Sequence, residues 1–131
     1  MSKFFSQLTL VIVSYNSSQK VIRLISKLNK KFKIIIVENS NDKKLEKKIL
    51  KKNKNIKFFF PHKNNGFGAG LNYGIKKCKS KYVLYLDIDT KISTTQILKL
   101  YRKTILTKNF GVITAKIKGQ NYKDLIIGKD K

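Results

Sequence analysis

Short apolar segments alternate with amphipathic segments along the chain, and this alternation constrains the fold more than any other feature of the sequence. Five apolar runs rich in β-branched or aromatic residues have the lengths of buried strands: residues 8–14, 33–38, 56–60, 82–86 and 110–117. Between them, apolar residues recur at the spacing of amphipathic helices: residues 21–32, 45–50, 68–78 and 97–105. This order predicts an α/β fold with an open, mostly parallel sheet, helices on both faces and right-handed crossovers, formed by residues 1–131 as a single domain.

The net charge of +23, from 30 basic and 7 acidic residues, points towards polyanionic partners. However, all the basic residues except Arg23 and Arg102 are lysine, whereas proteins that read nucleic-acid sequence rely on arginine. Lysine has codons rich in A and T, as do the abundant Asn, Ile and Phe, so a bias in base composition accounts for the lysines without a function. We therefore expect solvated lysine faces, with an anionic membrane as an alternative partner and nucleic acid as a less favoured one.

The composition excludes several other classes of protein. The single cysteine, Cys78, excludes an internal disulfide framework, and the single histidine, His62, excludes a Cys/His zinc cluster. The apolar runs are far shorter than the roughly 20 residues of a membrane-spanning helix, and no secretory leader pattern opens the chain. We predict a cytoplasmic location, with peripheral contact at the inner membrane face as a variant of that prediction.

Polar side chains gather where the predicted strands end. The first strand ends in Ser14-Tyr15-Asn16, and ligands of open parallel sheets bind at the carboxyl ends of the strands. Four of the seven acidic residues fall at the same edge: Glu38, Asp42, Asp87 and Asp89. The sequence therefore predicts a ligand site there.

Asp87-Ile88-Asp89 places two carboxylates just past the fourth predicted strand. Mg²⁺ and Mn²⁺ prefer such sites, because they take one or two carboxylates together with waters and the oxygens of a substrate diphosphate. Aspartates at strand ends also serve as helix caps and turn formers, and the tripeptide by itself leaves that alternative open.

A glycine-rich stretch, residues 64–74 (NNGFGAGLNYG), leads into the third predicted helix and forms its first half. Leu71 stands where the dinucleotide-binding fingerprint needs glycine, and no Gly-Lys-Ser/Thr follows to make a phosphate-binding loop. Glycines at 66, 68 and 70 would allow the backbone to approach either a ligand or a neighbouring strand, and both alternatives stay open.

Together these segments resemble the N-terminal part of the family 2 glycosyltransferases, which have the GT-A fold. The resemblance rests on four motifs in order: residues 11–17 (VIVSYNS), 37–42 (VENSND), 65–75 (NGFGAGLNYGI) and 84–90 (LYLDIDT). The third is similar to a stretch of the rhamnosyltransferase-like branch.

The resemblance implies inverting, metal-dependent transfer of a sugar from a nucleoside-diphosphate sugar to an acceptor hydroxyl. The implied nucleotide-binding residues are Ser14, Tyr15 and Asn16 around the nucleoside, Glu38 at the base, Asn65 and Gly66 near the ribose and diphosphate, and Asp87 near the ribose and sugar. Asp89 is the implied principal ligand of Mg²⁺ or Mn²⁺, with Asp87 beside it. The acceptor, a glycan or lipid-linked sugar of cell-surface polysaccharide biosynthesis, is not specified.

The chain departs from the family pattern in three places. Glu38 replaces an aspartate, and Asp-Ile-Asp stands where the rhamnosyltransferase-like branch often has Asn-Pro-Asp. The family's general base is a carboxylate well downstream, whereas the only acids after Asp89 are Asp124 and Asp130. We therefore expect a nucleotide-sugar-binding half without its acceptor half: a fragment, a degenerate copy, or one piece of a split enzyme whose partner chain supplies the rest.

Two other functions compete with this interpretation. A sugar-phosphate nucleotidyltransferase would carry a glycine-rich loop with Arg and Lys after the first strand, and residues 15–18 (YNSS) do not. A basic module that binds nucleic acid or an anionic membrane on a degenerate glycosyltransferase scaffold would show polyanion binding that falls steeply with salt.

Overall fold

The computed structural model describes residues 2–115. The chain divides into two compact units, residues 1–94 and 95–131, and each is described by itself. The first unit holds the whole described sheet, whereas the described part of the second holds most of α5 (Thr94–Leu106). That residues 1–131 act as one domain stays a prediction.

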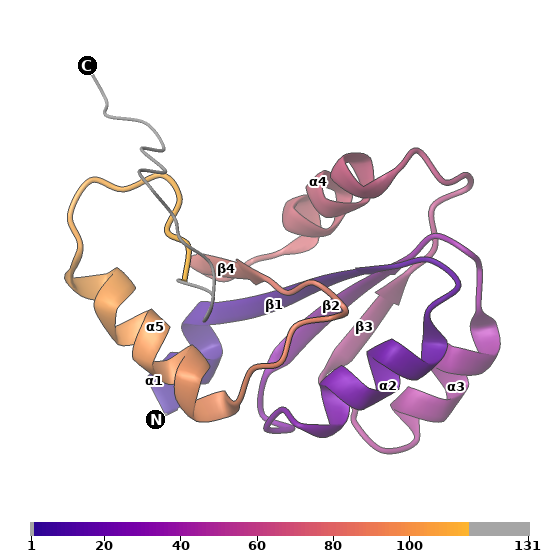
Figure 1. The fold of residues 1–131 in the computed structure, drawn as a ribbon, viewed down its shortest axis with the longest axis horizontal. Helices are drawn as coiled ribbons and strands as arrows, with labels where there is room; N and C mark the ends of the chain where they lie inside the picture. The colour runs from indigo at the N-terminus through magenta and orange to yellow at the C-terminus, as the bar shows by residue number, and fades with distance from the viewer. Residues whose placement is uncertain (1, 116–131) are drawn as a thin grey trace. The chain divides into compact units, whose positions relative to one another are not determined.

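Four parallel strands form the sheet in the order β3-β2-β1-β4 (Figure 1). Their bounds are β1 (Leu8–Ser14), β2 (Lys33–Glu38), β3 (Ile56–Phe59) and β4 (Tyr82–Tyr85). In the register, Leu10 of β1 lies opposite Ile34 of β2 on one side and Leu84 of β4 on the other. The predicted open parallel sheet is confirmed, and the first two strands have the predicted bounds.

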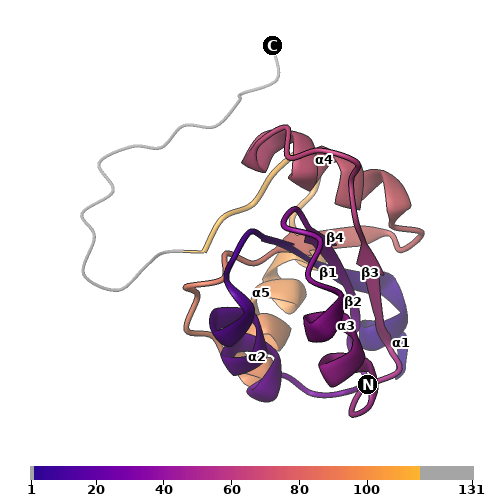
Figure 2. The ribbon, with the colours of Figure 1, turned by 90° about the vertical axis from the view of Figure 1, so that its right-hand side faces the viewer.

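The helices of the first unit are α1 (Ser2–Gln7), α2 (Ser18–Ser26), α3 (Lys43–Leu50) and α4 (Phe67–Lys77). Helices α2 and α3 cover one face of the sheet, and α4 covers the other (Figures 1 and 2). The chain passes from β1 to β3 in one direction and then returns beyond β1 to β4. Because crossovers keep one hand, this reversal places α4 on the face opposite α2 and α3.

The core lies on both faces of the central strands. Val11 and Val13 of β1 join Ile35 and Val37 of β2 in one buried cluster on the α4 side, where Leu71 packs against them. Every residue of β1 is buried. Burial on both faces explains why this strand reads as a continuous apolar run rather than as an alternation.

Helix α1 was not predicted from the sequence. Its Phe4 and Phe5 are buried and contact Phe32, with ring centroids 5.4 and 5.0 Å from that ring. A six-residue helix is too short to be stable alone. This aromatic packing, which joins residues distant in sequence, stabilises it.

The predicted fifth strand at residues 110–117 is wrong over its described part. Residues 110–115 have no strand structure; residues 116 and 117 lie outside the described residues, as do the predicted turn at 119–121 and the apolar run at 125–127. A strand needs a neighbour to pair with, and an apolar run provides only the propensity.

Among residues 2–115, no helix is both long enough and apolar enough to cross a bilayer.

Candidate functional site

The carboxyl edge of the sheet has the topology of a ligand site. Strand β1 lies between β2 and β4, so the chain leaves β1 towards one side of the sheet and reaches β4 on the other. Ligands of doubly wound sheets bind at this switch point. The predicted site residues that follow β1, β2 and β4 are therefore brought to the same edge.

The turn after β2 is organised around the buried carboxylate of Glu38. One oxygen accepts hydrogen bonds from the backbone amide of Ser40, at 3.2 Å, and from the Ser40 hydroxyl. The other oxygen accepts from the backbone amide of Asp42 at 2.6 Å. Because both oxygens are engaged within the turn and the side chain is only 1% exposed, contact of Glu38 with a nucleotide base stays a prediction.

The same turn is tied to the segment after β1. The backbone amide of Asn16 donates to the Ser40 hydroxyl at 3.1 Å, and Asn16 has a φ of 48°. Asparagine tolerates this left-handed conformation better than most residues, which gives the asparagine at the end of β1 a local structural reason. The adjacent loops are thereby held together through Ser40.

Asp42 joins the two helices that follow these loops. Its side chain caps α3 by accepting from the Leu45 amide at 2.9 Å, and it accepts from the Ser18 hydroxyl of α2 at 2.6 Å. The hydrogen bond from Ser18 and then that from Leu45 lower the pKa of the Asp42 carboxyl. This carboxylate is a structural anchor of the loops.

Ser14 and Tyr15 differ sharply in exposure. Ser14 is 1% exposed, and its hydroxyl is a buried polar group without a hydrogen-bond partner among residues 2–115. Tyr15 is 54% exposed at the rim of the edge. The structure thus presents Tyr15, and not the Ser14 hydroxyl, to a ligand; the roles of both in nucleoside binding stay predictions.

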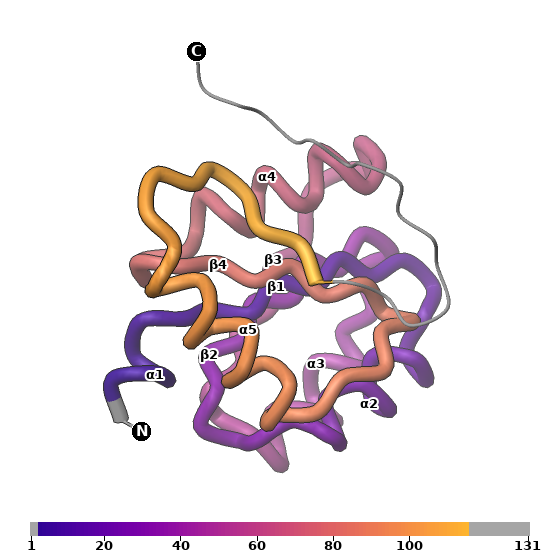
Figure 3. The backbone as a smooth tube through the Cα atoms, turned by 60° about the vertical axis from the view of Figure 1, so that its left-hand side comes forward, coloured from indigo at the N-terminus to yellow at the C-terminus, as the bar shows by residue number. Residues whose placement is uncertain are grey.

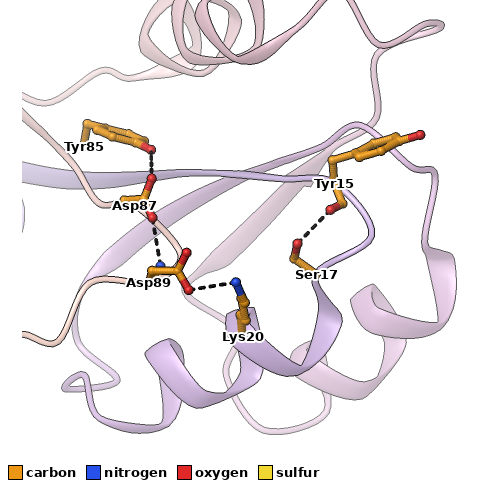
Figure 4. Close-up of polar contacts among 6 residues, drawn as sticks. All are labelled: Tyr15, Ser17, Lys20, Tyr85, Asp87 and Asp89. Carbon is orange, nitrogen blue, oxygen red and sulfur yellow. Dashed lines mark hydrogen bonds and ion pairs between the residues drawn. The ribbon is translucent and has the colours of Figure 1, made fainter.

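Asp87 is held in a tight turn directly after β4. One of its carboxylate oxygens accepts from the Asp89 backbone amide at 2.9 Å, and the other accepts from the Tyr85 hydroxyl at 3.2 Å (Figure 4). Burial and the nearby Asp87 charge raise the pKa of Tyr85. The Tyr85 hydroxyl donates to Asp87 and thereby orients that carboxylate.

Asp89 points from the same turn towards α2, where Lys20 forms an ion pair with it at 2.9 Å (Figure 4). The two side chains are 67% and 52% exposed, so the pair contributes little to stability. Figure 3 shows the segment after β4 leaving the sheet and passing α2. In Figure 4, Asp87 and Asp89 lie on the same rim as Tyr15 and Ser17.

Two carboxylates are the most that this turn offers a metal ion. No group of three or more His, Cys, Asp or Glu side chains comes together within residues 2–115. Such a donor set does not form a closed protein site, but it fits Mg²⁺ or Mn²⁺, which complete their coordination with water and substrate oxygens. Asp87 and Asp89 are the residues that fit this role.

The glycine-rich stretch is explained mainly by packing. A Cβ atom on Gly74 would lie 2.7 Å from Cγ1 of Val11, and one on Gly70 would lie 3.0 Å from Cγ1 of Val13, so these glycines let α4 approach the sheet closely. Gly68 faces open space. Gly66 has a φ of 89° and is the N-cap of α4.

The start of α4 also reaches the Asp87 turn. Phe67 contacts Tyr85 edge to face, with ring centroids 5.1 Å apart. Exposed Asn65 and Gly66 directly precede Phe67. The third and fourth sequence motifs are therefore linked through one aromatic contact and the hydrogen bond from Tyr85 to Asp87.

Sequence reasoning did not identify Lys20, Tyr85 or Phe67 as parts of this edge. Tyr85 carries a usable signal, because it precedes Asp87 by two residues and strand side chains alternate in direction. Lys20 carries no such signal in the sequence, since it is one of many lysines. Only the packing of α2 beside the Asp89 turn distinguishes Lys20 from the other lysines.

Comparison with solved structures shows the same fold in larger proteins. Crystal structures of S. aureus TarS are similar: TarS 1–349 with a TM-score of 0.62 and 19% identity, TarS 1–349 in complex with UDP with 0.60 and 21%, and TarS with 0.60 and 18%. Each alignment covers 86% of this chain and 40%, 39% and 24% of those chains, respectively, so this chain spans at most about two fifths of these neighbours. The likeness confirms the predicted fold class.

No curated protein matches the chain. The family model described as glycosyl transferase family 2 matches residues 9–128. This match covers all four motifs from which the resemblance was inferred. The chain belongs to glycosyl transferase family 2.

Proposed function

We propose that this chain binds a nucleoside-diphosphate sugar at the carboxyl edge of β1, β2 and β4, as the donor site of an inverting glycosyltransferase. The observation that carries the proposal is the position of Asp87 and Asp89 at the switch point, on the same rim as the turn after β1. Family membership supports the reaction class. The acceptor in this proposal is the hydroxyl of a glycan or lipid-linked sugar.

Asp89, with Asp87 beside it, would hold Mg²⁺ or Mn²⁺ in this proposal. The bound metal would neutralise charge that develops on the departing diphosphate. Asp87 is already oriented by Tyr85 and by the Asp89 amide, so this side chain needs little rearrangement to meet a ligand. The Lys20 ammonium beside Asp89 supplies a further positive charge for the diphosphate.

The nucleoside would lie along the turn after β1. Exposed Tyr15 offers an aromatic face to a base, while Asn16 and Ser40 hold the backbone beneath it. Asn65 and Gly66 would approach the ribose and diphosphate from the start of α4. The rhamnosyltransferase-like branch is part of the proposal only through residues 65–75, and Asp-Ile-Asp at 87–89 departs from that branch.

Only donor binding is assigned to the residues of the first unit. Inverting transfer requires a general base that removes the proton of the acceptor hydroxyl. The acids downstream of Asp89, Asp124 and Asp130, lie outside the described residues. We propose that acceptor activation comes from another part of the enzyme or from a partner chain.

Calorimetric titration of the chain with UDP, GDP and dTDP, with and without Mn²⁺, tests donor binding. UDP is the first probe because one structural neighbour was solved in complex with it. We expect one diphosphate to bind in a Mn²⁺-dependent manner and Asp89→Asn to weaken that binding about tenfold or more, since a charge-assisted contact contributes roughly 1.5–3 kcal/mol. Glu46→Gln on α3 removes the same charge outside the Asp87–Asp89 turn and is the matched control.

A salt series separates this proposal from general polyanion binding. Selective nucleotide binding should persist as salt rises and should favour one base. Binding that falls steeply with salt, does not distinguish the nucleotides and is equal in Asp89→Asn and Glu46→Gln would contradict the proposal.

A further inference from the structure

A basic hollow lies between α2 and the turn that follows Asp87. Its volume is about 90 Å³, which is enough for several waters or one phosphate-sized anion. Its lining comes from two short segments: Lys20, Arg23 and Leu24 of α2 with its C-cap Lys27, and Ile88, Asp89, Thr90 and Lys91 of the turn.

The hollow carries a marked excess of positive charge. Lys20, Arg23 and Lys27 recur at three- and four-residue spacing, so they lie on one side of α2, and Lys91 faces them from the turn. Asp89 is the only acid in the lining and is paired with Lys20. Among the described residues no ion pair to a carboxylate is formed by the other three cations.

Base-composition bias accounts for the three lysines of this cluster but not for its arginine, Arg23. Only two of the 30 basic residues are arginine, and Arg23 is one of them. The bias that fills the surface with lysine would favour lysine here too. Arginine presents a planar fork of donors that matches the geometry of phosphate oxygens.

The apolar floor of the hollow can hold the cationic side chains close together. Leu24 is 3% exposed and, with the half-buried Ile88, provides an apolar base along which the stems of the neighbouring cations can lie. Their charged ends are then gathered around a small volume. Coulomb repulsion among them is relieved when an anion enters.

We propose that this hollow is a phosphate-binding subsite that adjoins the donor site and is centred on Arg23, Lys27 and Lys91. Its ligand is a phosphate group, either free in solution or carried by an anionic lipid headgroup. Because Lys20 and Asp89 border both sites, an occupied hollow places a second phosphate next to the donor diphosphate.

A pair of matched double variants tests the subsite in the full chain. Arg23→Gln with Lys27→Gln removes two charges from the last turn and C-cap of α2. Lys47→Gln with Lys51→Gln removes two charges from the same positions of α3. Each ¹⁵N-labelled protein is titrated with inorganic phosphate while backbone amide shifts are recorded, and each is sedimented with phosphatidylcholine vesicles with or without phosphatidylglycerol.

We expect phosphate to shift the backbone amide signals of residues 20–27 and 88–91. The α2 double variant should weaken phosphate binding about tenfold or more, whereas the α3 double variant should change it less than about twofold. Arg23→Lys, which keeps the charge and loses the fork, should weaken it to an intermediate degree. If only vesicles with phosphatidylglycerol bind, with the same dependence on α2, the proposal is supported with a lipid headgroup as the source.

Three results would overturn the subsite. They are equal weakening by the two double variants, amide shifts spread evenly over the lysine-bearing helices, and no binding of either probe by the unaltered chain. Native-like amide spectra of all variants exclude unfolding as the cause of a loss, and both α2 substitutions are at exposed positions.

Discussion

Replacement of Gly74 by alanine should separate the packing role of the glycine-rich stretch from helix propensity. A Cβ at this position would lie 2.7 Å from Cγ1 of Val11 and 3.0 Å from Cγ2 of Val37. Both valines are fully buried in central strands, and β-branched side chains have little freedom to rotate away. Overpacking of this kind costs about 1–3 kcal/mol of unfolding free energy.

Gly68→Ala is the matched control in the same helix. Both substitutions gain helix propensity, up to about 1 kcal/mol in the helix interior, where Gly74 lies, and less in the first turn, where Gly68 lies. A Cβ on Gly68 meets nothing within 4 Å. Because the larger propensity gain favours Gly74→Ala, a lower stability of that variant gives a lower limit on the cost of overpacking. We expect Gly68→Ala to be as stable as the unaltered chain or more stable, and Gly74→Ala to be about 1–3 kcal/mol less stable than Gly68→Ala.

Urea unfolding followed by circular dichroism provides the measurement. With a slope of about 1–3 kcal/mol per molar for a small domain, the midpoints of the two variants should differ by on the order of 1 M. Equal midpoints would refute the reasoning, because they would mean that α4 does not rest on Val11 and Val37 at the distance seen here. A lower midpoint for Gly68→Ala would refute it equally.

Two further predictions concern side chains of the site. Asp42→Ala should lower stability by about 1 kcal/mol through loss of the α3 cap. Because folding lowers the pKa of Asp42, its extra stabilisation is complete above the ordinary value of 3.8 and is lost as the pH falls through the lower folded value. The difference in unfolding free energy between Asp42→Ala and the unaltered chain, measured by urea unfolding, should therefore narrow only at acid pH. A constant difference from pH 2 to 7 would contradict the linkage. Lys20→Met should tighten Mn²⁺ binding about two- to fivefold, because it removes the exposed ion pair that competes for Asp89. Electron paramagnetic resonance measures the Mn²⁺ affinity, and Lys30→Met is the control. An unchanged or weaker affinity in Lys20→Met would count against a metal at Asp89.

The centre of the sheet could be predicted from the sequence because β1 and β2 are buried on both faces. Continuous apolar runs define β1 and β2 to the residue, and parallel strands then bring Tyr15, Asp87 and Asp89 to one edge. The prediction of four strands is confirmed because each has a neighbouring strand to pair with. The prediction of a fifth strand is wrong over residues 110–115, because apolar character produces a strand only where a neighbour pairs with it.

The sequence by itself determined the order of elements from β1 to α5, the edge at which the polar residues gather and the family to which the chain belongs. Those conclusions depend on local periodicity and on motif spacing, which are properties of neighbouring residues. Only the tertiary structure decided that the Glu38 carboxylate accepts hydrogen bonds within its own turn, that Gly70 and Gly74 allow close packing of α4, and that Lys20 pairs with Asp89. The positions of the glycines and of Lys20 depend on distances between segments far apart in sequence, which are set by how α2 and α4 pack on opposite faces of the sheet. The bonding of Glu38 depends instead on the conformation of its own turn, because Ser40 and Asp42 follow it by two and four residues.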